Sequence, residues 1–291
     1  MTKKIMICLD LTEMDQALMR YARHLCEVLN TIEEAVFVHN IKFDYPEEAE
    51  SLMEELDRPL SELISEEINE KARQHFESES TPASWSVEVT NEAYTAQALA
   101  GLASQKNIGL VVCGKKISYR GTGRVAEKIL RLSSFKGDLL TVPETAPHRM
   151  ERLLVPVDFS PHSVKALALA NKIASGPAAK ITCQHVYTIP MHYFPFIPVQ
   201  GFRKSMEEQA RKDFDKFRKE LPEELRGIPC EFTYSKDRTI AQTVYDFAIN
   251  NNEDLIIIGS RGRSGLPAAL LGSTAIQLMQ FDFHVPLLVV R

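Results

Sequence analysis

The sequence has no long apolar run and no excess of positive charge. None of its hydrophobic stretches approaches the ~20 residues that a helix needs to cross a bilayer. The apolar stretch near the N-terminus stops at Asp10, too early for a secretion signal. The 291 residues carry a formal net charge of −5, which gives no general attraction to nucleic acid or to anionic lipid. We therefore expect neither a membrane nor a nucleic acid among the partners of this protein.

Closely spaced cysteines are also missing. The five cysteines, an odd number, include no close pair along the chain, which predicts reduced, buried thiols in a cytoplasmic protein. Histidines and acidic residues form no cluster at metal-ligand spacing. We interpret His39 and His185, which recur at matching places, as hydrogen-bonded scaffold residues, and we assign no metal ligand.

One pattern occurs twice along the chain. Residues 4–12 (KIMICLDLT) and 152–160 (RLLVPVDFS) each combine a basic residue, an apolar run, an aspartate and a hydroxyl residue. A helical pattern follows each of them, and later strands recur at nearly equal separations in the two halves. Such internal repetition predicts two similar domains. We expect them to span 1–147 and 148–291, with a linker at 145–150.

Each half predicts strands that alternate with helices, in the order β-α-β-α-β-α-β-α-β. This alternation is typical of a parallel sheet with helices on both faces. The fold class expected is thus α/β, with two doubly wound, Rossmann-like parallel sheets of five strands each. Long charged helices are expected between the second and third strands of each half, at about 47–77 and 202–220.

The second half contains a glycine motif directly after an apolar strand, in the stretch GSRGRSGLPAALLGST at 259–274. Glycines let backbone N–H groups come close to an anion, and the start of the following helix adds unpaired N–H groups and a favourable dipole. In parallel sheets, ligands bind beyond the carboxyl ends of the strands, where this motif lies. The motif therefore predicts a phosphate cradle, made of Gly259, Arg261, Gly262, Arg263, Gly272, Ser273 and Thr274.

Two better-known phosphate motifs are not present. The chain has no Gly-Lys-Ser/Thr, so the lysine of a Walker loop is missing. Residues 121–126 (GTGRVA) fit G-x-G-x-x-A, but they begin eight positions after Cys113, the last residue of their strand, so we interpret them as a surface loop. No nucleophile, base and orienting acid stand out either, and we assign no catalytic residue. Slow ATP hydrolysis is the most that we expect.

On these residues the chain resembles the universal stress protein family. The spacing G-2x-G-9x-G-S is similar to the nucleotide motif of that family, and residues 155–160 and 185–186 are similar to its first two strands. Two such domains resemble its tandem members. The resemblance implies ATP or AMP, with or without Mg²⁺, in the second domain. It implies that Asp158 bonds the adenine edge or the ribose, between apolar walls and the glycine motif. The expected binding residues are Pro156, Val157, Asp158, Val186, Ile258, Gly259, Arg261, Gly262, Gly272, Ser273 and Thr274.

The first domain departs from this pattern. Asp10 is kept, but Cys8 replaces the proline, residues 115–117 lack the second glycine, and Glu127 falls at the position that matches Gly272. A carboxylate there would repel a phosphate. We predict that the first domain does not bind a nucleotide in the same way.

The function implied is stress protection or regulation in the cytoplasm, in response to an adenine nucleotide. The last strands, near 139–142 and 287–290, are expected to pair about a pseudo-twofold axis, so that the chain mimics a dimer and could dimerise further. The segment 189–202, with three prolines and four aromatic residues, could dock a protein partner, cover the nucleotide or pack on its own domain. Two alternatives remain open: a nucleotide-independent scaffold, and a slow ATPase or self-phosphorylating protein that uses Ser260, Ser264 or Ser273 as acceptor.

Overall fold

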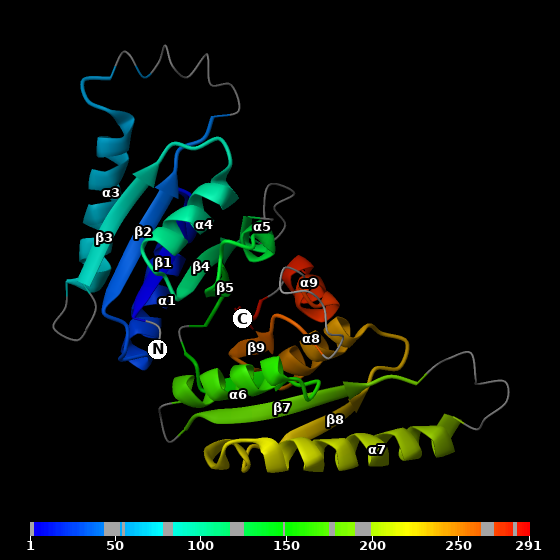
Figure 1. Ribbon diagram of the computed structural model, residues 1–291. Coiled ribbons are helices and arrows are strands. Elements are labelled where there is room, and N and C mark those ends of the chain that lie inside the picture. The colour runs from blue at the N-terminus through cyan, green and yellow to red at the C-terminus, as the bar shows by residue number, and fades with distance from the viewer. Residues whose placement is uncertain are drawn as a thin grey trace. The chain divides into compact units, whose positions relative to one another are not determined.

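The computed structural model divides into two compact units, Met1–His148 and Arg149–Arg291 (Figure 1). Each is an α/β unit in which helices alternate with parallel strands, as the sequence predicts. The pairing of the two last strands about a pseudo-twofold axis stays a prediction. The structure describes residues 3–43, 53, 56–77, 84–116, 125–147, 149–174, 178–189, 199–262, 271–281 and 284–291.

The first unit has five parallel strands in the order β3-β2-β1-β4-β5. The strands are β1 (Lys4–Leu9), β2 (Glu34–Asn40), β3 (Ser84–Thr90), β4 (Leu110–Lys115) and β5 (Asp138–Pro143). The helices are α1 (Met14–Val28), α3 (Leu60–Phe76), α4 (Thr95–Gln105) and α5 (Val125–Arg131).

The second unit repeats this arrangement, with five parallel strands in the order β10-β9-β6-β7-β8. The strands are β6 (Arg152–Pro156), β7 (Lys180–Tyr187), β8 (Cys230–Tyr234), β9 (Leu255–Gly259) and β10 (Leu287–Val290). The helices are α6 (Pro161–Ile173), α7 (Val199–Glu220), α8 (Ile240–Asn250) and α9 (Ser273–Gln280), with a short 3₁₀ helix, η2 (Glu223–Leu225).

Burial on both faces explains the composition of the central strands. All four residues of β10 and the first four of β9 are buried, because helices cover both sides of the sheet. Figure 1 shows α7 and α8 on opposite sides of β7 and β8. Local signals define where the helices begin. Thr239 and Gln242 form a capping box at α8, and Ser160 caps α6 just before Pro161.

Two expected segments differ from the structure. The charged helix expected over 47–77 is observed as Leu60–Phe76, and most of the residues before it lie outside the described residues. The helix expected from 202 begins at Val199, so the end of the 189–202 segment is helical. The last proline of that segment, Pro198, directly precedes the helix, and a proline there does not interrupt it. The rest of the segment, 190–198, lies outside the described residues, as do 121–123, Arg263 and Ser264.

Among the described residues, no helix is both long enough and apolar enough to cross a membrane.

Candidate functional site

A cavity of about 380 Å³ opens at the carboxyl ends of β6, β7 and β9 in the second unit. The chain leaves β6 toward β7 on one side and returns to β9 on the other, and this reversal of strand order opens a crevice in the sheet. All eleven expected binding residues line this cavity. Of the part of the chain that the structure describes, six further residues line it that the sequence did not single out for binding: Ser163, Gln184, His185, Ile240, Val244 and Ala275.

Asp158 is held in place at the end of β6 by the start of α6. Its Oδ1 accepts hydrogen bonds from Ser163 Oγ at 2.7 Å and from the Ser160 N–H at 3.1 Å. Its own N–H donates to Ser163 Oγ at 3.1 Å. The residue that caps α6 is Ser160, whose Oγ accepts from the Ser163 N–H. Asp158 is therefore not the helix cap, and its carboxylate faces the cavity with one oxygen anchored.

Two glycines of the motif allow close contacts within the chain itself. A Cβ on Gly259 would lie 2.7 Å from His162 Cβ, so the end of β9 can pack against α6 only without a side chain. A Cβ on Gly262 would lie 2.6 Å from Asp158 Oδ2. Gly272 is less constrained, since its nearest neighbour would be at 3.5 Å. Gly262 thus brings the loop backbone directly against the anchored carboxylate.

The start of α9 provides the part of the cavity that suits an anion. Gly272 is the N-cap residue and offers no side-chain cap, so the N–H groups of the first turn have no such acceptor. Ser273, Thr274 and Ala275 of this first turn line the cavity, together with Arg261. The positive end of the helix dipole adds to the charge of the guanidinium group. This end of the cavity favours a negatively charged group.

An apolar wall forms the other side of the cavity. Pro156, Val186 and Ile258 come from the three strands, as expected. Ile240 and Val244 add one face of α8, and Ile240 is 39% exposed, which is high for a large apolar side chain. Their spacing of four residues predicts a shared helix face, but only the packing of α8 decides that this face meets the cavity.

Two polar residues of β7, Gln184 and His185, also line the cavity and are held by hydrogen bonds. Gln184 is fully buried, and its Nε2 donates to Thr233 Oγ1 at 3.1 Å. His185 Nδ1 lies 2.8 Å from the Val157 carbonyl, and its ring stacks on Phe159 with the centroids 4.3 Å apart. A carbonyl only accepts, so Nδ1 carries the proton in this contact. His185 is thus a hydrogen-bonded scaffold residue, as predicted.

His39 makes the matching contact in the first unit, where its Nδ1 lies 3.0 Å from the Leu9 carbonyl. The interpretation of His39 as scaffold is therefore also confirmed. Within the described ranges, no group of three or more His, Cys, Asp or Glu residues could hold a metal ion.

The matching end of the first unit has different chemistry. The Asp10 carboxylate forms an ion pair with Lys116 at 2.8 Å. Asp15 occupies the place of Ser163 and accepts from the Asp10 N–H at 3.0 Å. Burial raises the pKa of the Asp15 carboxyl, and the Asp10 N–H offsets part of this shift. The Asp15 carboxylate and the Lys116 ammonium group therefore both lie beside Asp10, which the sequence pattern did not indicate.

Contrary to what the sequence predicted, Glu127 does not occupy the position in the first unit that corresponds to Gly272 in the second. It is the third residue of α5, which begins at Val125, whereas Gly272 precedes the first residue of α9. Its carboxylate pairs with Arg131 at 2.7 Å, one turn along the helix. The negative charge still lies in the first helical turn, where it competes with any anion for the helix dipole.

Comparison with known proteins gives the family. The model of the universal stress protein family matches residues 150–291. Universal stress protein MJ0531 of Methanocaldococcus jannaschii is 28% identical over 145 residues, which are 48% of this chain and 82% of that protein. Universal stress protein YxiE of Bacillus subtilis is 27% identical over 149 residues, which are 48% of this chain and 98% of that protein.

Solved structures extend the similarity of fold to the whole chain. A universal stress protein from Archaeoglobus fulgidus covers 100% of this chain, with 98% of its own length, a TM-score of 0.64 and 17% identity. One from Pseudomonas aeruginosa covers 99% of this chain, with 93% of its own length, a TM-score of 0.62 and 15% identity. The second half of the chain therefore matches the universal stress protein family, and both halves have the α/β fold seen in structures of that family.

Proposed function

We propose that this protein binds an adenine nucleotide, ATP or AMP, in its second unit and responds to it as a regulator or protector under stress. One observation carries the proposal: a single cavity joins an anchored carboxylate, an apolar wall and a helix N-terminus without a side-chain cap. These three features complement the hydroxyl or amino groups of a nucleoside, the faces of its base, and its phosphates.

Each part of the cavity would take one part of the ligand. Asp158 would accept a hydrogen bond from a ribose hydroxyl or from the adenine edge. Ile240 and Val186 would contact the faces of the base, and the first turn of α9 with Arg261 would hold phosphate oxygens. In the present structure, the Gly272 N–H donates to the Ser260 carbonyl at 2.8 Å. A bound ligand would stabilise this arrangement of the loop and so favour one conformation of the protein surface around the cavity.

Mg²⁺ fits this site only when the phosphates of the nucleotide coordinate it. Among the described residues that line the cavity, Asp158 is the single carboxylate, and one of its oxygens already accepts two hydrogen bonds. Mg²⁺ commonly keeps several waters and relies on one or two carboxylates together with substrate phosphates. When bound, it would neutralise charge on the phosphates, while Asp158 remains directed at the nucleoside.

Binding measurements on the full chain test the proposal. Purified protein is denatured and its released small molecules are analysed, and ATP and AMP are then titrated by calorimetry. We expect one nucleotide per chain, lost in Asp158→Ala and in Gly262→Glu. Asp10→Ala, the matching change in the first unit, should leave binding intact, because Lys116 already occupies that carboxylate.

The other outcomes would contradict the proposal in distinct ways. No nucleotide in any form of the protein would favour the nucleotide-independent scaffold. ADP that accumulates over many turnovers, and stops in the same variants, would favour an ATPase. Two nucleotides per chain at saturation would show that the first unit also binds.

Self-phosphorylation is less favoured by the positions of the described serines. Ser260 is only 1% exposed, and a buried hydroxyl group is a poor phosphate acceptor. Ser273, in contrast, lines the cavity. Ser264 lies outside the described residues.

A cytoplasmic location is part of the proposal and is supported by the five cysteines, which are all free thiols. A protein partner at 189–202 stays a prediction.

A further inference from the structure

Two cysteines far apart in the sequence face each other on neighbouring strands of the second unit. Cys183 on β7 and Cys230 on β8 are register partners, and the Cys183 N–H donates to the Pro229 carbonyl at 2.9 Å. Adjacent strands lie about 4.8 Å apart, and disulfides join Cα atoms separated by about 4.4–6.8 Å. The strand pairing therefore brings the two thiols within the range of a disulfide bond.

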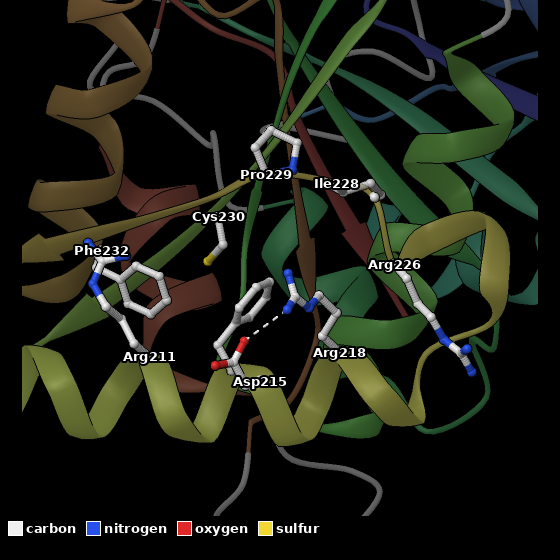
Figure 2. A pocket seen from close by; sticks show the side chains of 10 residues that line it. Arg211, Asp215, Arg218, Arg226, Ile228, Pro229, Cys230 and Phe232 are labelled. Carbon is white, nitrogen blue, oxygen red and sulfur yellow. Dashed lines mark hydrogen bonds and ion pairs between the residues drawn. The ribbon is translucent and has the colours of Figure 1, made fainter.

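The two thiols differ in their access to solvent. Cys183 is 1% exposed, whereas Cys230 is partly exposed and lines a second cavity of about 380 Å³. Figure 2 shows the sulfur of Cys230 directed toward α7, between the side chains of Phe232 and Arg218. A small oxidant that enters this cavity would reach Cys230 first.

Charged side chains surround the opening of this cavity. The described residues that line it include three arginines, of which Arg218 pairs with Asp215 at 3.1 Å and Arg211 with Glu207 at 2.8 Å. Arg211 stacks its guanidinium over the Phe232 ring at 4.5 Å, and Arg226 donates to a backbone carbonyl. Cys230 lines this cavity and is partly exposed, so it is placed as the thiol that meets the oxidant.

Cys183 is placed as the second, resolving thiol. It is buried and so sheltered from the oxidant, yet it is the register partner of Cys230, which the oxidant modifies. The neighbouring Cys230 thiol, followed by burial, raises the pKa of the Cys183 thiol, so Cys183 must pass its proton to the departing hydroxyl group as the S–S bond forms.

We propose that Cys183 and Cys230 form a redox site that hydrogen peroxide oxidises to a disulfide. The Cys230 sulfur attacks one peroxide oxygen, the O–O bond breaks, and Cys230 becomes a sulfenic acid as one water leaves. The Cys183 sulfur then displaces the hydroxyl as a second water, and the S–S bond forms. Two thiols lose two electrons, and one peroxide is reduced to two waters.

The geometry also makes the bond reversible. A disulfide needs Cβ atoms about 3.5–4.5 Å apart, which is closer than the spacing of two strands, so the strands must tilt or approach. Strained disulfides are reduced easily by thiols. The site is independent of the nucleotide cavity and would tie the edge strand β8 to β7 under oxidising conditions.

Thiol counting on the full-length protein tests this inference. Reduced protein is treated with hydrogen peroxide, denatured, alkylated and examined by intact and peptide mass spectrometry. We expect alkylated thiols to fall from five to three, with one linked pair of peptides that carry Cys183 and Cys230, and dithiothreitol should restore all five. In Cys183→Ser, dimedone should capture a sulfenic acid at Cys230. In Cys230→Ser, Cys183 should stay reduced.

A double variant separates this site from a second cross-strand pair. Cys8 and Cys113 are register partners on β1 and β4, so Cys8→Ser/Cys113→Ser removes them, and two of its three remaining thiols should still be lost. Any one of three results would overturn the inference: no loss of thiols, a link between other cysteines or between two molecules, or oxidised Cys230 that stays unlinked while Cys183 is present.

Discussion

Replacing Gly262 with alanine tests how closely the glycine loop must approach Asp158. The new Cβ would lie 2.6 Å from Asp158 Oδ2, well inside contact distance, so the loop or the carboxylate must move. Asp158 is anchored by Ser163 at 2.7 Å and by the Ser160 N–H at 3.1 Å. Each hydrogen bond to a charged group contributes about 1.5–3 kcal/mol. Either movement therefore removes interactions of that size from the proposed nucleotide site.

The expected result is a weaker site in a folded protein. A loss of about 1.5–3 kcal/mol corresponds to a rise of about 10- to 100-fold in Kd, since every 1.4 kcal/mol is about tenfold. Calorimetric titration of ATP and AMP measures the Kd, and thermal unfolding shows whether Gly262→Ala still folds. Unchanged affinity in a variant that melts like the wild type would refute the claim that this close approach shapes the site.

Gly201 offers a matched control for the same substitution. It lies in α7 of the same unit, and an added Cβ there would meet nothing within 4 Å. Gly201→Ala should leave the Kd for nucleotide unchanged. It should raise the stability of the protein by less than the ~0.5–1 kcal/mol that separates alanine from glycine in a helix interior, because Gly201 lies in the first turn.

Two further predictions concern stability. Asp254 is 1% exposed and accepts hydrogen bonds from Arg149 at 2.7 Å and from the N–H groups of Glu151 and Arg152. Asp254→Ala leaves these donors without their acceptor and should lower the free energy of unfolding, measured in urea, by at least ~2 kcal/mol. A loss below ~1 kcal/mol would contradict this. Burial, followed by Arg261 and Lys165, lowers the pKa of His162 below 6.5. The folded protein therefore binds this proton less readily than the unfolded chain, so the contribution of His162 is complete above pH 6.5 and declines as the pH falls through that value toward the folded pKa. His162→Asn should flatten this part of a pH series of melting temperatures, and an unchanged slope would contradict the assignment.

The order and type of the elements were predictable from local patterns. The last strand of the second half, expected near 287–290, has those bounds in the structure, and the one expected near 139–142 spans Asp138–Pro143. Alternating or continuous apolar residues define a strand, and hydroxyl residues before an apolar stripe define a helix start. Where the pattern was weak the prediction was wrong, as at Val199, because a helix rich in charged residues gives no clear boundary in the sequence.

The candidate site was predictable only in part, for a related reason. The glycines form a local motif with a recognisable spacing, Asp158 directly follows an apolar strand, and both line the cavity. Ile240 and Val244 join them from a helix that shares no local motif with them, and in the first unit Lys116 closes on Asp10 in the same way. Nothing in a linear pattern shows which helix face meets which strand end.

The sequence by itself determined that the chain repeats one α/β pattern and that its second half carries glycines at a spacing that predicts a phosphate cradle. These properties depend on the spacing of neighbouring residues, which decides the surface that each element buries and the backbone that each turn can adopt. Only the tertiary structure decided that Cys183 meets Cys230 and that Asp15 lies beside Asp10 in the place of Ser163. Such contacts depend on strand order and register, which the packing of the whole sheet sets together.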